Sequence, residues 1–204
     1  MSKSARTRAQ KNSKKKNALT QRQTPWGGIV FFTAIGLAAA VAITFAFLQS
    51  RSSSADGASI AGVVSKEGLG RDHTQAAVKY DSSPPMGGAH DPMWQNCDAR
   101  VYDRPLRDEN AVHALEHGAV WVAYRPDLPA DQRDLLAAKI KATDYSLMSP
   151  YPALDKPIAL TAWGKQLKVD KASDPRVNKF LLAYVKGPQT PEPGAACTGA
   201  KDTP

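Results

Sequence analysis

Residues 27–48 constrain the fold of this chain more than any other feature, because 22 consecutive positions carry no charged side chain. A helix rises about 1.5 Å per residue, so about 20 such residues cross a hydrocarbon core about 30 Å thick. Buried helices of soluble domains rarely run this long without a charge. The segment also exceeds the apolar core of a cleaved signal peptide, which spans about 7–15 residues. We therefore predict one transmembrane helix that acts as an uncleaved signal anchor.

Basic residues are concentrated ahead of this segment. Residues 1–25 contain eight lysines and arginines and no acidic residue, so the net charge of +8 lies entirely before the apolar segment. A basic cluster can bind nucleic acid, but beside a bilayer the positive-inside rule and the attraction of anionic lipid account for it. We predict a cytoplasmic tail at 1–26, the lipid bilayer as the partner of 27–48, no nucleic-acid partner, and a cell-membrane protein whose C-terminal part is extracytoplasmic.

The outer part divides into a linker and one domain. Residues 49–62 are rich in Ser, Gly and Ala, which is typical of a flexible linker, and residues 63–204 are long enough to bury one core. Both cysteines, Cys97 and Cys197, fall where thiols are normally oxidised. A disulfide would close a loop of about 100 residues and would keep the C-terminal tail, the Pro- and Gly-rich residues 187–204, attached to the domain. The alternative, Cys97 as a metal ligand or nucleophile, leaves Cys197 without a role.

Helix and strand patterns alternate along this domain. Three helices are expected: Arg107–His117, with Asp108 as N-cap and Gly118 after its end; Pro129–Ala142; and a last helix that Asp174 caps and Pro175 begins. Runs of β-branched and aromatic residues predict strands at 119–124 and 157–164, with a shorter one at 145–148. Since each helix has one apolar face, the expected fold is a two-layer α/β (α+β) sandwich.

Most of the reactive side chains lie between Pro84 and Gly118, including three of the four histidines. His113 and His117 are four residues apart on a predicted helix, so both imidazoles project from one face and can bind one ion. His90 sits on a loop that contains glycines, whose backbone freedom lets it approach this pair. His73 precedes a predicted strand and adds a fourth nitrogen. This pattern predicts a metal site built from histidines.

Methionines extend the candidate ligand set toward copper. Met86, His90 and Met93 form the pattern M-x3-H-x2-M, and Met148 is available elsewhere. Imidazoles suit Zn(II) and Cu(II), while thioethers select Cu(I). We therefore predict copper, with zinc as the alternative, and Met86 and Met148 as candidate ligands. Glu116 is expected either to contact a ligand rather than the ion or to be a charge on the helix surface.

Two other interpretations remain open. His113-Ala-Leu-Glu116-His117 spells H-x-x-E-H, the arrangement of inverted zinc peptidases, in which two histidines bind zinc and the glutamate is the general base. So short a pattern arises readily by chance, and no further acidic ligand is clearly placed, so a catalytic role is not the favoured one. In the other interpretation each histidine forms internal hydrogen bonds, and the domain is a membrane-tethered interaction or scaffold module whose protein partner the sequence does not identify.

Several phrases together resemble a known family: HTQAAVKY (73–80), PPMGGAH (84–90), WQNC (94–97), VHALEHGAVWVAYRP (112–126), and SPYP followed by TAWG. They are similar to single-pass membrane proteins of actinobacteria catalogued as domain of unknown function 3105. The resemblance covers about residues 63–197 and implies a histidine at each of the four positions His73, His90, His113 and His117. Asp98 departs from it, because the family often has a glycine there. The resemblance implies no activity.

Overall fold

The computed structural model describes residue 44 and residues 60–204. The predicted cytoplasmic tail, the anchor at 27–48 apart from residue 44, and nearly all of the linker lie outside the described residues and stay predictions. Within the part of the chain that the structure describes, no helix is both long and apolar enough to cross a membrane. The chain divides into two compact units, Met1–Phe47 and Leu48–Pro204, and the second contains the described residues 60–204.

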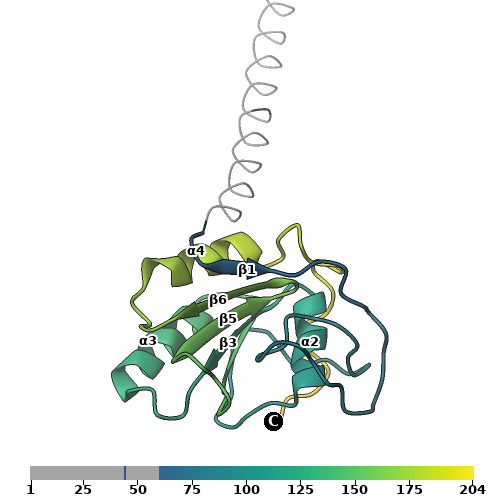
Figure 1. Cartoon of the computed structure of the whole chain (residues 1–204), viewed down its shortest axis with the longest axis horizontal. Coiled ribbons are helices and arrows are strands. Elements are labelled where there is room, and N and C mark those ends of the chain that lie inside the picture. The colour runs from purple at the N-terminus through teal and green to yellow at the C-terminus, as the bar shows by residue number, and fades with distance from the viewer. Residues whose placement is uncertain (1–43, 45–59) are drawn as a thin grey trace, which may run out of the picture. The chain divides into compact units, whose positions relative to one another are not determined.

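One mixed sheet forms the centre of this second unit (Figure 1). Its six strands are β1 (Val63–Ser65), β2 (Arg100–Val101), β3 (Val120–Tyr124), β4 (Ser146–Pro150), β5 (Ile158–Ala162) and β6 (Lys165–Val169). They lie in the order β1-β6-β5-β3-β4-β2. β4 pairs in parallel with β2 and β3, and the other pairs are antiparallel. The α+β class that the sequence predicts is therefore confirmed.

Helices cover both faces of this sheet: α2 (Asp108–Glu116), α3 (Ala130–Lys141) and α4 (Pro175–Tyr184). Val120 and Val122 of β3 share a core with Leu136 of α3 and Phe180 of α4. Trp121, which points to the opposite face, belongs to a second core with residues of α2, and Figure 1 shows α2 on the other side from α3. The two-layer prediction was therefore wrong. Because all five residues of β3 are buried, both of its faces need a cover.

Local signals account for where the helices begin and end. The side chain of Asp174 accepts a hydrogen bond from the backbone N–H of Arg176, and Pro175 occupies the first turn of α4, as predicted. Gly118 follows α2 with a φ of 103°, a conformation that favours glycine. Asp108 is not the predicted cap, however, because Arg107 occupies that position and its side chain forms no capping hydrogen bond. Asp108 instead accepts a hydrogen bond from the Tyr151 hydroxyl at 3.1 Å.

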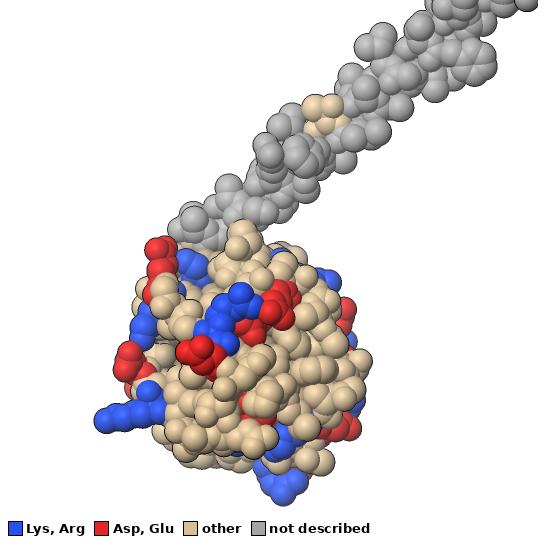
Figure 2. Space-filling model, turned by 90° about the vertical axis from the view of Figure 1, so that its right-hand side faces the viewer, with Lys and Arg blue, Asp and Glu red and all other residues tan. Residues whose placement is uncertain are grey.

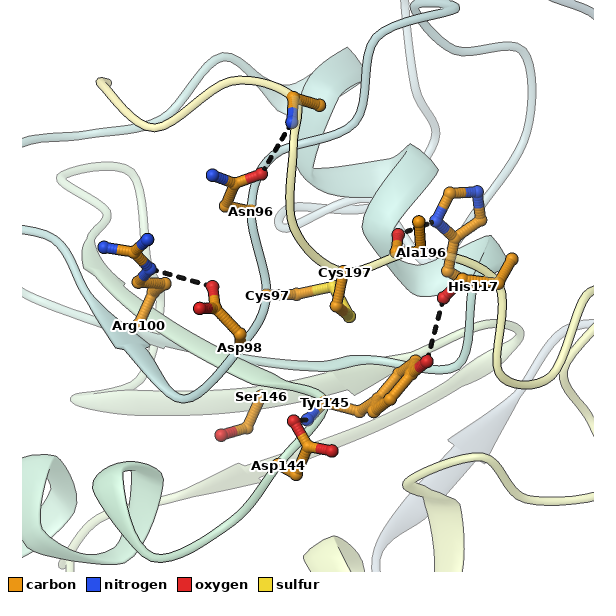
Figure 3. The surroundings of a disulfide bond; sticks show 12 residues. Asn96, Cys97, Asp98, Arg100, His117, Asp144, Tyr145, Ser146, Ala196 and Cys197 are labelled. Carbon is orange, nitrogen blue, oxygen red and sulfur yellow. Dashed lines mark hydrogen bonds and ion pairs between the residues drawn. A yellow bond between two sulfur atoms is a disulfide. The ribbon is translucent and has the colours of Figure 1, made fainter.

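The predicted disulfide between Cys97 and Cys197 is present and joins the C-terminal tail to the domain (Figure 3). It links residues 100 positions apart whose Cα atoms lie 4.8 Å from each other. Backbone hydrogen bonds extend the attachment, since Cys97 N–H donates to the Cys197 carbonyl at 2.8 Å. The Asn96 side chain accepts a hydrogen bond from the N–H of Ala200 at 3.0 Å. The tail is thus fastened beside the end of α2.

Candidate metal centre

Four side chains from three segments converge beside α2. Each of His73, His90, His113 and Glu116 offers one nitrogen or oxygen atom, and these atoms all lie within 4.8 Å of one another. His73 is exposed, while the other three are buried. One ion of a transition metal can therefore be reached by three imidazoles and a carboxylate.

Backbone pairing brings the first two histidines together. Thr74 N–H donates to the carbonyl of His90 at 2.7 Å, and His90 N–H donates to the carbonyl of Asp72 at 2.9 Å. Their ring centroids are consequently 4.9 Å apart. The strand expected after His73 is absent. His73 and His90 form an isolated β-bridge, and the residues that follow His73 pair with no strand. An isolated bridge therefore positions His73.

Glycines shape the loop before His90, as predicted. Gly87 and Gly88 have φ values of 136° and 120°, which side chains rarely adopt. A Cβ atom on Gly87 would also lie 2.9 Å from Leu69 and 3.1 Å from the Trp163 ring. The carbonyl of the next residue, Gly88, accepts a hydrogen bond from His90 Nδ1 at 2.7 Å. The loop therefore sets the orientation of the imidazole.

Both buried histidines direct the same ring nitrogen into the site. His113 Nδ1 lies 2.6 Å from the carbonyl oxygen of Asp91, as His90 Nδ1 does from that of Gly88 at 2.7 Å. A carbonyl only accepts, so each Nδ1 carries the proton, and Nε2 keeps its lone pair. Backbone carbonyls commonly orient metal-binding histidines in this way. Each ring therefore keeps one lone pair free for an ion, and the ligand atoms of the group lie within 4.8 Å of one another.

The carboxylate of Glu116 completes the group. One of its oxygens is 2.9 Å from His90 Nε2, and the other accepts a hydrogen bond from Arg71. Burial raises the pKa of Glu116, but the hydrogen bond from Arg71 and the charges of His90 and Arg71 lower it, so on balance the pKa lies below its ordinary value. The ionised oxygen of Glu116 therefore faces Nε2 of His90, a buried nitrogen with no hydrogen-bond partner in the described part of the chain. Either a second proton on His90 or a metal cation satisfies this contact.

Burial keeps His113 neutral. It lowers the pKa of the imidazole from 6.5 to about 4; the hydrogen bond to Asp91 raises it, and His117, His90 and His73 lower it further. A metal binds the neutral form of imidazole. At neutral pH, His113 thus needs to lose no proton before it acts as a ligand.

His117 lies next to this group but is not part of it. Its ring centroid is 4.6 Å from that of His113, and its Nδ1 donates to the carbonyl of Ala196 at 2.6 Å (Figure 3), but His117 is not among the four residues whose ligand atoms lie within 4.8 Å of one another. Its ring also lies against Trp94, with centroids 5.1 Å apart. The H-x-x-E-H peptidase arrangement needs both histidines on the ion and the glutamate off it. Here Glu116 belongs to the group of candidate ligands, and His117 does not.

The methionines lie apart from each other. Met148 is 1% exposed in the core that β4 shares with α3 and α4, on the opposite face of the sheet from α2. Met86 is buried, lines a small pocket of about 180 Å³ with Leu69 and Tyr80, and its carbonyl accepts a hydrogen bond from Gly164 N–H at 2.7 Å. The structure therefore does not bring both thioethers to the histidines.

The sequence could have identified Glu116 as a ligand candidate, because it lies three residues after His113 on the same helix face.

The side of the domain with α2 carries side chains of both signs on a largely uncharged surface (Figure 2). Among the described residues, Arg71 pairs with Glu116 and Glu192, and Arg107 pairs with Asp91. Because these charges of opposite sign pair with one another, the electrostatic potential near the site is not uniformly of one sign.

Fold and site together define an α+β domain with a candidate histidine and glutamate metal centre. The family described as "Protein of unknown function (DUF3105)" matches residues 72–199, and the chain belongs to this family. The matched range contains all four candidate ligands and both cysteines. No curated protein and no solved structure matches the chain.

Proposed function

We propose that this protein binds one divalent transition-metal ion on the outer side of a cell membrane. Three imidazoles and the carboxylate of Glu116 are the ligands. The observation that carries this proposal is the contact of 2.9 Å between Glu116 and His90 Nε2, in which neither partner has a hydrogen to donate when His90 is neutral. A cation placed among the four ligand atoms satisfies this nitrogen and this oxygen at once.

The donor set favours Cu(II), with Zn(II) as the alternative. Three nitrogens and one carboxylate oxygen suit both ions, and both cysteines are occupied in the disulfide. At such a site Cu(II) binds more tightly than Zn(II) in the Irving–Williams order. The case for Cu(I) is weaker, since Met148 lies in the opposite core. The copper proposal therefore rests on the imidazoles.

The differing exposure of the ligands favours metal binding and exchange over a closed structural site. His90, His113 and Glu116 are buried, while His73 is exposed. A metal ion can therefore enter or leave on the side of His73 without unfolding of the other three ligands. This is the arrangement expected of a protein that takes up or passes on a metal.

The membrane anchor belongs to the same proposal. The uncharged segment 27–48 and the basic residues before it support a single span with a cytoplasmic N-terminus. The disulfide supports an oxidising outer compartment for the domain. The metal site would then operate outside the cytoplasm, close to the bilayer.

A metal-loading experiment on the full chain tests the proposal. The protein is purified in detergent, stripped with a chelator, offered equimolar Cu²⁺ and Zn²⁺, washed, and analysed for metal by mass spectrometry. We expect about one ion per chain, with Cu²⁺ in excess over Zn²⁺. His113→Ala should lose the ion, whereas His117→Ala, a change of the neighbouring histidine, should retain it. Retention of neither metal above the buffer level would leave an interaction domain without a metal.

A further inference from the structure

The C-terminal tail closes the end of α2 that carries the metal site. Glu192 N–H donates to the carbonyl of Glu116 at 3.0 Å, and Gly194 N–H donates to the carbonyl of His117 at 3.1 Å. The carbonyl of Ala196 in turn accepts the hydrogen bond from His117 Nδ1 (Figure 3). Carbonyls at the end of a helix lack partners within it. Here the tail supplies those partners.

The same tail also reaches the carboxylate of the metal site through Arg71. The guanidinium binds one oxygen of Glu116 with Nε and one oxygen of Glu192 with Nη2. The side chains of Arg71 and Glu192 are each 48% exposed, while that of Glu116 is 3% exposed. An exposed arginine with one ion pair is held weakly, because ordering its long side chain costs entropy. Glu192 gives Arg71 a second anchor and so fixes the orientation of Glu116.

The disulfide holds this part of the tail in place. Cys197 follows Glu192 by five residues and is bonded to Cys97, which is fully buried. Apart from this bond, residues 192–197 are attached by hydrogen bonds, such as those of Glu192 and Gly194 to the end of α2, and by the ion pair of Glu192. The Cys97–Cys197 bond thus helps to keep Glu192 beside Arg71, and Arg71 in turn binds the buried carboxylate of Glu116.

We propose that Glu192 is a positioning residue of the metal centre and that the Cys97–Cys197 disulfide makes its metal affinity depend on the redox state of the protein. A dithiol reductant breaks the S–S bond, yielding two cysteine thiols and the oxidised cyclic disulfide of the reductant. Without the cross-link the hydrogen bonds of the tail open more readily, so Glu192 separates from Arg71 more often and Glu116 loses its fixed orientation toward His90. This inference rests on the proposed metal site.

Zn²⁺ affinity, measured on the full chain by competition with a chromophoric chelator, tests the inference. Glu192→Gln should weaken binding about three- to fivefold, the effect of one exposed ion pair. The double variant Cys97→Ser with Cys197→Ser should weaken it about tenfold or more, as loss of the groups that support a ligand does. Serine replaces cysteine because free thiols would bind the metal themselves. Asp202→Asn is the matched control, since this tail carboxylate pairs with Arg100 at 3.1 Å and not with Arg71.

A second measurement separates positioning from folding. With Cu²⁺ as the probe, the electron paramagnetic resonance spectrum of Glu192→Gln should differ from that of the wild type while its melting temperature stays the same. That comparison holds even if the serine variant fails to fold. Wild-type protein that binds no Zn²⁺ would overturn the metal site itself. Wild-type binding with an unchanged affinity and spectrum in Glu192→Gln would overturn the role of Glu192 and leave the metal site standing.

Discussion

Loss of the disulfide should destabilise this domain more than most single substitutions. In Cys197→Ser the unfolded chain regains the freedom of a loop whose ends are 100 residues apart in sequence. The chain-entropy model gives about 4.7 kcal/mol for a loop of about 100 residues, and residual structure in the unfolded state reduces this value. For a domain of about 150 residues, each kcal/mol shifts the melting temperature by about 2–4 °C. We therefore expect a fall of about 10–15 °C.

Thermal unfolding of the full chain, monitored by near-ultraviolet circular dichroism with a metal chelator present, measures this effect. The chelator is needed because bound metal would stabilise the folded state separately. Wild-type protein reduced with a dithiol is the control and should melt at the temperature of the variant. A fall of less than about 3 °C would refute the reasoning, because the cross-link would then constrain little of the unfolded chain.

Burial, charge and sequence support three further predictions. Phe180→Ala should cost about 3–5 kcal/mol in urea unfolding, since Phe180 is fully buried, while Leu182→Ala, at a residue 85% exposed, should change little. The pKa of His113 is about 4 in the folded chain and 6.5 in the unfolded chain, so the metal-free protein should lose stability as the pH falls from 6.5 to about 4. His113→Asn should make the free energy of unfolding depend less on pH in this range. An unchanged dependence would contradict the prediction. A reporter that is active only in the cytoplasm, fused after Pro204, should stay silent; a strong signal would reverse the predicted orientation.

Elements with strong local signals were predictable from sequence, and elements made by tertiary pairing were not. Pro129 and Asp174 mark the starts of α3 and α4, and both helices begin at the residues after them. β1 and β2 have three and two residues, too few for a pattern to appear. β6 carries two lysines among its five residues and becomes a strand because it pairs with β5.

The site shows the same division. Helical spacing placed His113, Glu116 and His117 on one face, but the choice between Glu116 and His117 depends on distant groups. Ala196 engages His117 across 79 residues, and Arg71 orients Glu116 across 45. No local pattern encodes such contacts. Helical spacing alone therefore does not distinguish Glu116 from His117 as the partner of His113, whereas the group that the structure brings together contains Glu116.

The position of the ion tests the proposed metal centre most directly. Crystals of the Cu²⁺-loaded protein, measured above and below the copper absorption edge, would locate the metal from its anomalous scattering. We predict one peak per chain, at about 2 Å from Nε2 of His90 and of His113, as in zinc–imidazole bonds, with His73 and Glu116 as the other protein ligands. A peak bound by His117 or Met86 instead, or no peak in protein that carries copper in solution, would contradict the proposed centre.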